Sequence, residues 1–159
     1  MEKKTTACFT GHRPKKLKST KEEIEKKLAR SIDDAVSRGF DTFITGLAEG
    51  VDLWAGSIIL QKKQNGEKLR LVAAQPFRNY SEESPEFREI LDGADEVYII
   101  TDEICDPEDD EPYSERDRWM VDNSSLVISV YEGQSGGTRN TIEYAQKNNV
   151  EVVYLYDRL

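Results

Sequence analysis

The chain has 159 residues, of which 37% are hydrophobic and 33% are charged, and its formal net charge is −9. This balance excludes a disordered chain, and the length predicts one globular domain over residues 1–159. Neutralisation of phosphates by Lys and Arg drives nucleic-acid binding, so we expect no general binding of DNA or RNA. Residues 12–30 are nevertheless rich in Lys and Arg, which leaves a local basic patch open.

The N-terminus and the cysteine content point to the cytoplasm. No apolar run approaches the roughly 20 residues of a membrane-spanning helix, and Met1–Lys4 does not lead into the apolar core of a signal peptide. Two cysteines and one histidine are too few for a zinc site and fit a reducing compartment. We therefore expect a cytoplasmic protein with no metal, no resident cofactor and no membrane partner.

Short apolar runs alternate with helical patterns along the whole chain. Runs of β-branched and aromatic residues predict buried strands, and apolar residues at helical spacing predict the helices between them. The acidic stretch 102–111 predicts a solvated loop or a mobile lid. In chain order we first expect strand 5–10 and a helix that begins after Ser19 or Thr20, has Glu22 or Glu23 in a capping box and ends at Gly39. Next come strand 41–45, helix 51–63, strand 69–74 closed by Pro76, and helix 82–92. The last elements are strand 96–101, helix 113–123 with Ser114 as a possible cap, strand 126–131, helix 138–148 stopped by Asn149, and strand 150–156.

The strand–helix alternation predicts the fold class. Strands that are apolar on both faces are typical of a sheet covered by helices on both sides. We expect an α/β, Rossmann-like three-layer sandwich with a mostly parallel sheet of about six strands. In such sheets ligands bind beyond the carboxyl ends of the strands, where the strand order reverses. The loops that follow strands are therefore the candidate site.

The loop after the first strand reads Gly11-His12-Arg13-Pro14. Gly11 allows a tight turn close to a ligand, and Arg13 offers a planar fork suited to phosphate or carboxylate. His12 can bond a ligand or transfer a proton. The alternative interpretation is an ordinary turn with a surface arginine.

The loop after the second strand contains two glycines and leads into a helix. Backbone N–H groups at that helix start can point at an anion. Asp52 can order the loop or receive a ribose hydroxyl, and Glu49 can act as an acid or base. The alternative is a strand-to-helix turn that uses glycine for its geometry. The binding candidates here are Thr45, Gly46, Ala48, Glu49, Gly50 and Asp52.

The loop after the fifth strand, residues 133–138, is again rich in glycine. Gly136 and Gly137 open a helix, and Thr138 can cap it or donate its hydroxyl to phosphate. Two such helix starts on one sheet edge favour an anion site more strongly than either alone.

The segments FTGHRP, ITGLAEGVD and YEGQSGGTRNTIEYA, in this order and spacing, resemble the SLOG superfamily and within it the YpsA-like branch of small bacterial proteins. The resemblance covers nearly the whole chain and implies a Rossmann-like fold and a nucleotide or nucleotide-derived ligand. The loop that contains Gly46, Ala48, Gly50 and Asp52 is similar to a loop of the DNA-processing protein DprA. The resemblance to YpsA-like proteins implies that Arg116 is part of the binding pocket; the alternative is that Arg116 is an ordinary surface charge.

The end of the chain resembles the LOG phosphoribohydrolases in part. Gly136, Gly137 and Thr138 match part of their PGGxGTxxE motif, whereas Thr141 stands where that motif has its catalytic glutamate. Glu143 lies two residues further on, about 200° away on a helix.

Three functions follow as alternatives. The favoured one is a sensor or regulatory domain that binds a phosphate-bearing, nucleotide-like small molecule. The second is a phosphoribohydrolase-like enzyme that uses His12, Glu49 or Asp52, and the weaker third is DprA-like binding of single-stranded DNA. The sequence also leaves open whether the chain forms a homo-oligomer.

Overall fold

The structure is a computed structural model that describes residues 1–159. It contains six strands, five α-helices and two short 3-10 turns. The elements are η1 (Lys3–Thr5), β1 (Thr6–Gly11), η2 (Pro14–Lys16), α1 (Lys21–Ser37), β2 (Thr42–Thr45), α2 (Val51–Gln64), β3 (Arg70–Phe77), α3 (Pro85–Gly93), β4 (Glu96–Thr101), α4 (Asp110–Asp122), β5 (Leu126–Val130), α5 (Gly137–Lys147) and β6 (Glu151–Tyr154).

All six strands are parallel and form one sheet in the order β4-β3-β2-β1-β5-β6. The chain builds outward from β1 to β4 and then returns to the other side of β1 for β5 and β6. The strand order therefore reverses between β1 and β5, which is where α/β sheets of this kind leave a crevice for ligands. The predicted fold class is confirmed.

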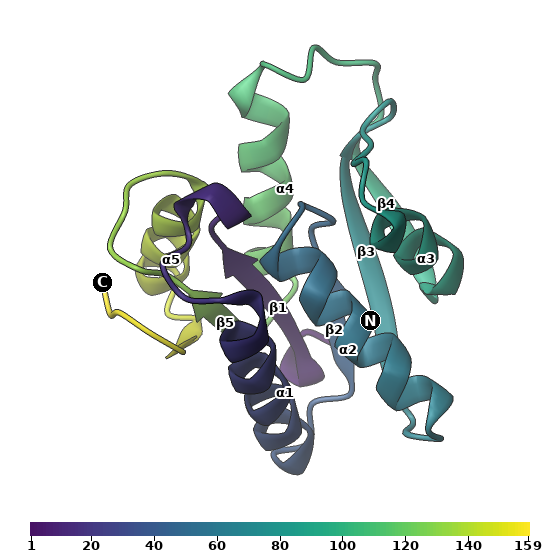
Figure 1. Cartoon of the computed structure of the whole chain (residues 1–159). Coiled ribbons are helices and arrows are strands. Elements are labelled where there is room, and N and C mark those ends of the chain that lie inside the picture. Colours follow the sequence, from purple (N-terminus) through teal and green to yellow (C-terminus); the bar gives the residue numbers. More distant parts are fainter.

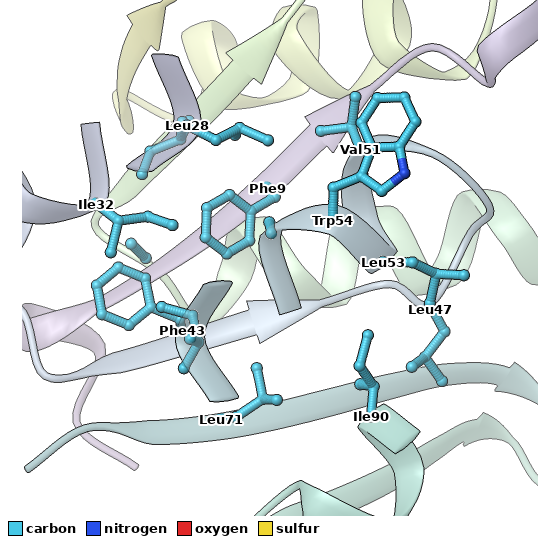
Figure 2. Close-up of a cluster of buried hydrophobic side chains, with 14 of the residues drawn as sticks. Phe9, Leu28, Ile32, Phe43, Leu47, Val51, Leu53, Trp54, Leu71 and Ile90 are labelled. Atoms are coloured by element: carbon cyan, nitrogen blue, oxygen red, sulfur yellow. The ribbon is translucent and has the colours of Figure 1, made fainter. Parts of the chain in front are cut away.

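The helices form two layers on opposite faces of the sheet (Figure 1). Helices α1, α2 and α3 contact one face, and α4 and α5 contact the other. Alternate residues of the strands supply the two cores: Phe9 packs toward α1 and α2, whereas Cys8 packs toward α4 and α5. Figure 2 shows the first core, in which Phe9 and Phe43 meet side chains from α1 and α2. Burial on both faces is the period-2 pattern of a covered sheet.

Local signals set the first helix. Thr20 accepts a hydrogen bond from the N–H of Glu23, and the Glu23 carboxylate accepts one from the N–H of Thr20. This is the predicted capping box, which satisfies two N–H groups that the helix leaves unpaired. Gly39, at φ +99°, follows the last turn, as expected of a residue that ends a helix in the left-handed region. No helix in the chain combines the length and the apolarity that crossing a membrane requires.

Helix α4 begins earlier than predicted. It starts at Asp110 rather than Tyr113, and Asp109, not Ser114, caps it by accepting a hydrogen bond from the N–H of Glu111. The end of the acidic stretch is therefore helical and not loop. Carboxylates in a first turn are stabilised by the partial positive charge of the helix N-terminus. The last acidic residues of this stretch therefore form the first turn of α4.

Strand β3 also departs from the prediction, because it continues through Pro76 to Phe77. Its pairing with β2 ends at Ala73, opposite Thr45, while its pairing with β4 runs on to Phe77. One side of β3 is therefore free of strand partners at Pro76, and a proline without an N–H is tolerated there. Proline also starts α3, at Pro85, three residues later than predicted.

Strand β4 is an edge strand with an uncovered apolar surface. Val97, Tyr98 and Ile99 are 44%, 38% and 36% exposed. The outer N–H and C=O groups of an edge strand lack a neighbouring strand, so such edges tend to pair with other chains. This edge lies on the far side of the sheet from the strand-order reversal.

Candidate functional site

A cavity of about 370 Å³ lies beyond the carboxyl ends of the strands. It is bounded by the loop after β1, the start of α5 and one side of α4, and so it lies where the strand order reverses. Its lining residues are Phe9, Thr10, Gly11, His12, Arg13, Lys16, Ala48, Asp52, Pro107, Asp110, Tyr113, Arg116, Asp117, Met120, Gly137 and Thr138.

Gly11 is at the cavity wall, but its small size serves packing. A Cβ added there would lie 2.6 Å from the Cβ of Val51, the first residue of α2. The backbone of Gly11 does not adopt the left-handed region. Glycine at this position therefore lets α2 approach the end of β1, which differs from the tight-turn role predicted from sequence.

His12 is 4% exposed, and its Nε2 has no hydrogen-bond partner in the protein. Burial and the nearby positive charge of Lys16 lower its pKa, whereas Glu132 acts in the opposite direction. The imidazole ring lies 5.5 Å from the Tyr131 ring. Buried polar atoms are nearly always hydrogen-bonded, so the unpaired Nε2, which is itself closed off from solvent, is an exception.

Arg13 bridges the cavity rim to the loop after β3. Its Nη1 lies 2.9 Å from Oε1 of Glu82, and the Arg13 side chain is 46% exposed. The same Oε1 accepts a hydrogen bond of 2.7 Å from the Tyr80 hydroxyl. Partial burial works against the charge of Arg13, but the Glu82 carboxylate outweighs this and raises its pKa. The guanidinium is thus held at the rim with part of its donor fork facing solvent.

The loop after β2 is organised by its own side chains. Oδ2 of Asp52 accepts a hydrogen bond of 3.3 Å from the Ala48 N–H, and the Thr45 hydroxyl donates to the Asp52 carbonyl at 2.8 Å. Leu47 and Gly50 both have positive φ, of 69° and 100°. Of the two readings of Asp52, the structure therefore shows the loop-ordering one. The Ala48 N–H is already used and is not free for an anion.

The buried side chains of Asp52 and Arg116 and the partly exposed Asp117 form a cluster of ionisable groups where this loop meets α4. Nη1 of Arg116 donates to the Gly46 carbonyl at 2.7 Å, and its Nε donates to Asp117 at 3.0 Å. Burial raises the pKa of Asp52 to about 7, although the charge of Arg116 acts in the opposite direction. Arg116 thus connects α4 to the loop after β2, two segments that lie 70 positions apart in the sequence.

Helix α5 starts at the cavity with its N-terminus uncapped. Gly136, at φ +134°, takes the cap position and offers no side-chain hydrogen bond. The prediction that Thr138 can cap the helix is therefore wrong. Thr138 lies buried in the first turn, on the cavity wall. The first N–H groups of a helix have no partner within it, so they are free to bind an anion. Thr141 donates its hydroxyl to the Gly137 carbonyl at 2.8 Å.

The structure brings eight of the predicted binding residues to the cavity and leaves five away from its lining. The lining residues are Gly11, His12, Arg13, Ala48, Asp52, Arg116, Gly137 and Thr138. The other five are Thr45 and Gly46, which are buried at the end of β2, Gly50 and Gly136, which occupy N-cap positions without capping bonds, and Glu49, which is exposed. Glu49 contacts Glu82 through its N–H at 3.4 Å.

Sequence reasoning missed most of the α4 wall. Asp110, Tyr113, Asp117 and Met120 line the cavity beside Arg116. Their spacing of three or four residues puts them on one side of the helix. That pattern is readable in the sequence once α4 is known to begin at Asp110. Lys16 and Pro107, which lie in turns, carried no comparable signal.

The family model named YpsA, described as the "YspA SLOG family", matches residues 7–158. The chain belongs to this SLOG family. It is similar to a UPF0398 protein of Bacillus cereus (strain ATCC 14579), at 27% identity over 156 residues that cover 91% of this chain and 84% of the relative. It is also similar to the "Uncharacterized SPbeta prophage-derived protein YoqJ" of Bacillus subtilis (strain 168), at 25% identity over 139 residues that cover 79% of this chain and 81% of the relative.

Two solved structures share the fold of this SLOG chain. DNA processing protein A from Helicobacter pylori, in a study of its "unique single-stranded DNA binding mode", matches with a TM-score of 0.66 at 18% identity and covers 97% of this chain. DNA processing protein A (DprA) from Streptococcus pneumoniae matches with a TM-score of 0.70 at 17% identity and covers 94% of this chain. The chain spans 66% and 49% of those two proteins.

This likeness corrects one expectation. The prediction of no nucleic-acid binding, made from the net charge of −9, is wrong as an exclusion, because a protein with this fold is described as binding single-stranded DNA. The physical reason is that net charge sums over the whole surface, whereas binding depends on the local field. In this chain the basic residues 13–18 and the acidic residues 102–111 are separate segments.

Proposed function

We propose that this SLOG chain binds a nucleotide-derived small molecule, with its phosphate at the N-terminus of α5, and acts as a sensor or regulatory domain. The observation that carries the proposal is the uncapped start of α5 at the cavity, where Gly137 and Thr138 line the wall. Lys16 and Arg13 add positive charge to the same wall. Backbone N–H groups with nearby cations are the usual means of binding phosphate.

Binding is favoured over hydrolysis by the positions of Glu49 and Asp52, two of the three catalytic candidates. Glu49 is exposed and outside the cavity lining, and Asp52 is engaged by the Ala48 N–H. Thr141, in place of a catalytic glutamate, is bonded to the backbone of its own helix. A general base needs hydrogen-bond reach to the scissile group. Release of free base from AMP by the wild type, abolished in Asp52→Asn, would show that the chain is an enzyme.

Calorimetric titration with AMP and ADP-ribose tests the binding site. Arg13→Ala removes a donor fork, and Gly137→Asp puts a carboxylate at the proposed phosphate position; each is expected to weaken binding by about tenfold or more. Both positions have room for the change, since Arg13 is half-exposed and a Cβ at Gly137 meets no atom closer than 3.8 Å.

Lys15→Ala is the matched control. Lys15 is exposed and outside the cavity lining, so removing its charge is expected to leave nucleotide affinity unchanged. Equal losses in Lys15→Ala and Arg13→Ala, or unchanged affinity in both cavity variants, would contradict the site.

A second candidate function is binding of single-stranded DNA. Two observations favour it: the fold shared with the Helicobacter pylori protein and the basic segment 13–18 at the cavity rim. Such binding would weaken steeply with salt, because each phosphate contact releases counterions. Titration of an oligo-dT strand at 50 and 200 mM salt distinguishes the candidates. If the chain binds DNA, its affinity for the oligo-dT strand should fall steeply between the two salt concentrations, and Lys15→Ala should bind the strand more weakly than the wild type. If the chain binds only nucleotides, neither effect is expected.

A further inference from the structure

A second, smaller cavity of about 190 Å³ adjoins the first. The two share Arg13, Pro107 and Tyr113 as lining residues, so a single ligand can reach both. Pockets for whole small molecules typically measure about 300 Å³ or more, which the first cavity reaches and the second does not. The second cavity therefore suits one part of a ligand. Its remaining lining residues are Phe77, Asn79, Tyr80, Ser81 and Glu82.

Three aromatic side chains are among the eight residues that line the second cavity. Phe77, Tyr80 and Tyr113 pack edge to face, with centroids 5.5 to 6.1 Å apart. The Tyr80 hydroxyl lies 3.3 Å from the Leu47 carbonyl and 2.7 Å from Glu82, so its ring is fixed in place. Arranged in this way before binding, aromatic side chains offer a planar ring a surface at little cost in conformational entropy.

The opposite side of the second cavity is also held in place. The amide side chain of Asn79 exchanges two hydrogen bonds with the backbone of Cys105, at 2.9 and 3.1 Å. The Tyr113 hydroxyl donates to the Pro107 carbonyl at 2.8 Å. The acidic segment before α4 is thereby tied to the loop after β3, and its residues 102–109 form a mostly exposed loop, which is one of the two alternatives predicted from its charge. The cavity has walls that are ordered without a ligand.

One acceptor in this cavity has no protein partner. Three donors converge on Oε1 of Glu82: the Arg13 guanidinium, the Tyr80 hydroxyl and the Glu49 N–H. No hydrogen bond within the protein reaches Oε2 of Glu82, since all three donors bind Oε1. A carboxylate oxygen of this kind can accept a hydrogen bond from an amino group of a ligand.

We propose that the second cavity binds the heterocyclic base of the nucleotide whose phosphate occupies the first cavity, and that Glu82 selects bases with an exocyclic amino group. This inference rests on the proposed function. Arg13 lies on the boundary of both cavities, where it can contact the phosphate while keeping its ion pair with Glu82. The chemical class is a purine or pyrimidine nucleotide with an amino-bearing ring, as in AMP.

Calorimetry with AMP, IMP and ribose 5-phosphate tests the proposal. These ligands share the phosphate and ribose but carry an amino-bearing ring, a ring with a carbonyl in its place, and no ring. The wild type is expected to bind AMP at least about tenfold more tightly than the other two. In Glu82→Gln the preference for AMP over IMP is expected to shrink.

Filling the second cavity gives an independent arm. Ser81→Trp places a large ring in that cavity. It is therefore expected to weaken the binding of AMP by about tenfold and to leave the affinity for ribose 5-phosphate unchanged. Glu83→Trp is the matched control, because Glu83 is exposed and lines neither cavity. Equal affinity of the wild type for AMP and ribose 5-phosphate overturns the base site but leaves the phosphate site standing. Absence of binding by all three ligands overturns both.

Discussion

Asp52 is a carboxyl group that the fold buries at the cavity wall, where burial raises its pKa to about 7. An unfolded chain ionises such a group near pH 4. Between these values the folded chain keeps a proton that the unfolded chain has released. Because the unfolded state then binds fewer protons, the free energy of unfolding falls as pH rises through this window.

Asp52→Asn removes this pH dependence. Its amide oxygen can still accept the Ala48 N–H, so the loop is expected to keep its conformation. Urea denaturation should give similar stability for variant and wild type below pH 4, where Asp52 is protonated in both the folded and the unfolded state. At pH 8 the variant should be more stable, by up to about 4 kcal/mol, since each pKa unit is worth about 1.4 kcal/mol. Parallel pH profiles for the two proteins would contradict the assignment.

Gly11 and Gly137 line the same cavity but have different surroundings. A Cβ at Gly11 would lie 2.6 Å from that of Val51, whereas a Cβ at Gly137 would have its nearest neighbour, an oxygen of Asp117, 3.8 Å away. Gly11→Ala is therefore expected to cost about 1–3 kcal/mol of stability by overpacking. Gly137→Ala should change stability by less than about 1 kcal/mol. Thermal denaturation of both variants checks this, and equal costs would show that Gly11 is not confined by α2.

At the scale of elements, the start of α4 offers a direct comparison. Asp109→Ala removes the side chain that accepts the Glu111 N–H and is expected to cost about 1 kcal/mol. Ser114→Ala changes the residue that sequence alone suggested as the cap, and it should have little effect because Ser114 lies inside the helix. Chemical denaturation of the two variants distinguishes a helix that starts at Asp110 from one that starts near Ser114. A larger loss of stability in Ser114→Ala than in Asp109→Ala would contradict the observed start.

Elements were predictable where local chemistry decides them. The capping box of Thr20 and Glu23 and the apolar strand runs depend on neighbouring residues, and both are confirmed. The start of α4 and the passage of β3 through Pro76 were not. The start of α4 follows from carboxylates that stabilise a helix N-terminus, although an acidic run of this kind is also typical of a solvated loop. The second depends on which side of β3 lacks a partner, which only the sheet order determines.

At the scale of the whole molecule, parallel strands explain why three distant loops were expected at one edge. Their carboxyl ends meet at one side of the sheet, so Gly11, Ala48 and Gly137 line one cavity. The sequence could not reveal that Arg116 reaches the Gly46 carbonyl, because that contact depends on how α4 packs across the sheet. Nor could it reveal the second cavity, whose walls come from β3 and the loop after it, the loop after β1, and α4 with the segment before it.

The most direct test of the cavity as a nucleotide site is a titration of the isotope-labelled chain with AMP, followed by the backbone amide signals in NMR spectra. We predict saturable shifts concentrated at Gly11, His12, Gly137 and Thr138, with Val97 and Ile99 on the β4 edge unchanged. Amide signals that do not move with AMP, or that move only on the β4 edge, would contradict it.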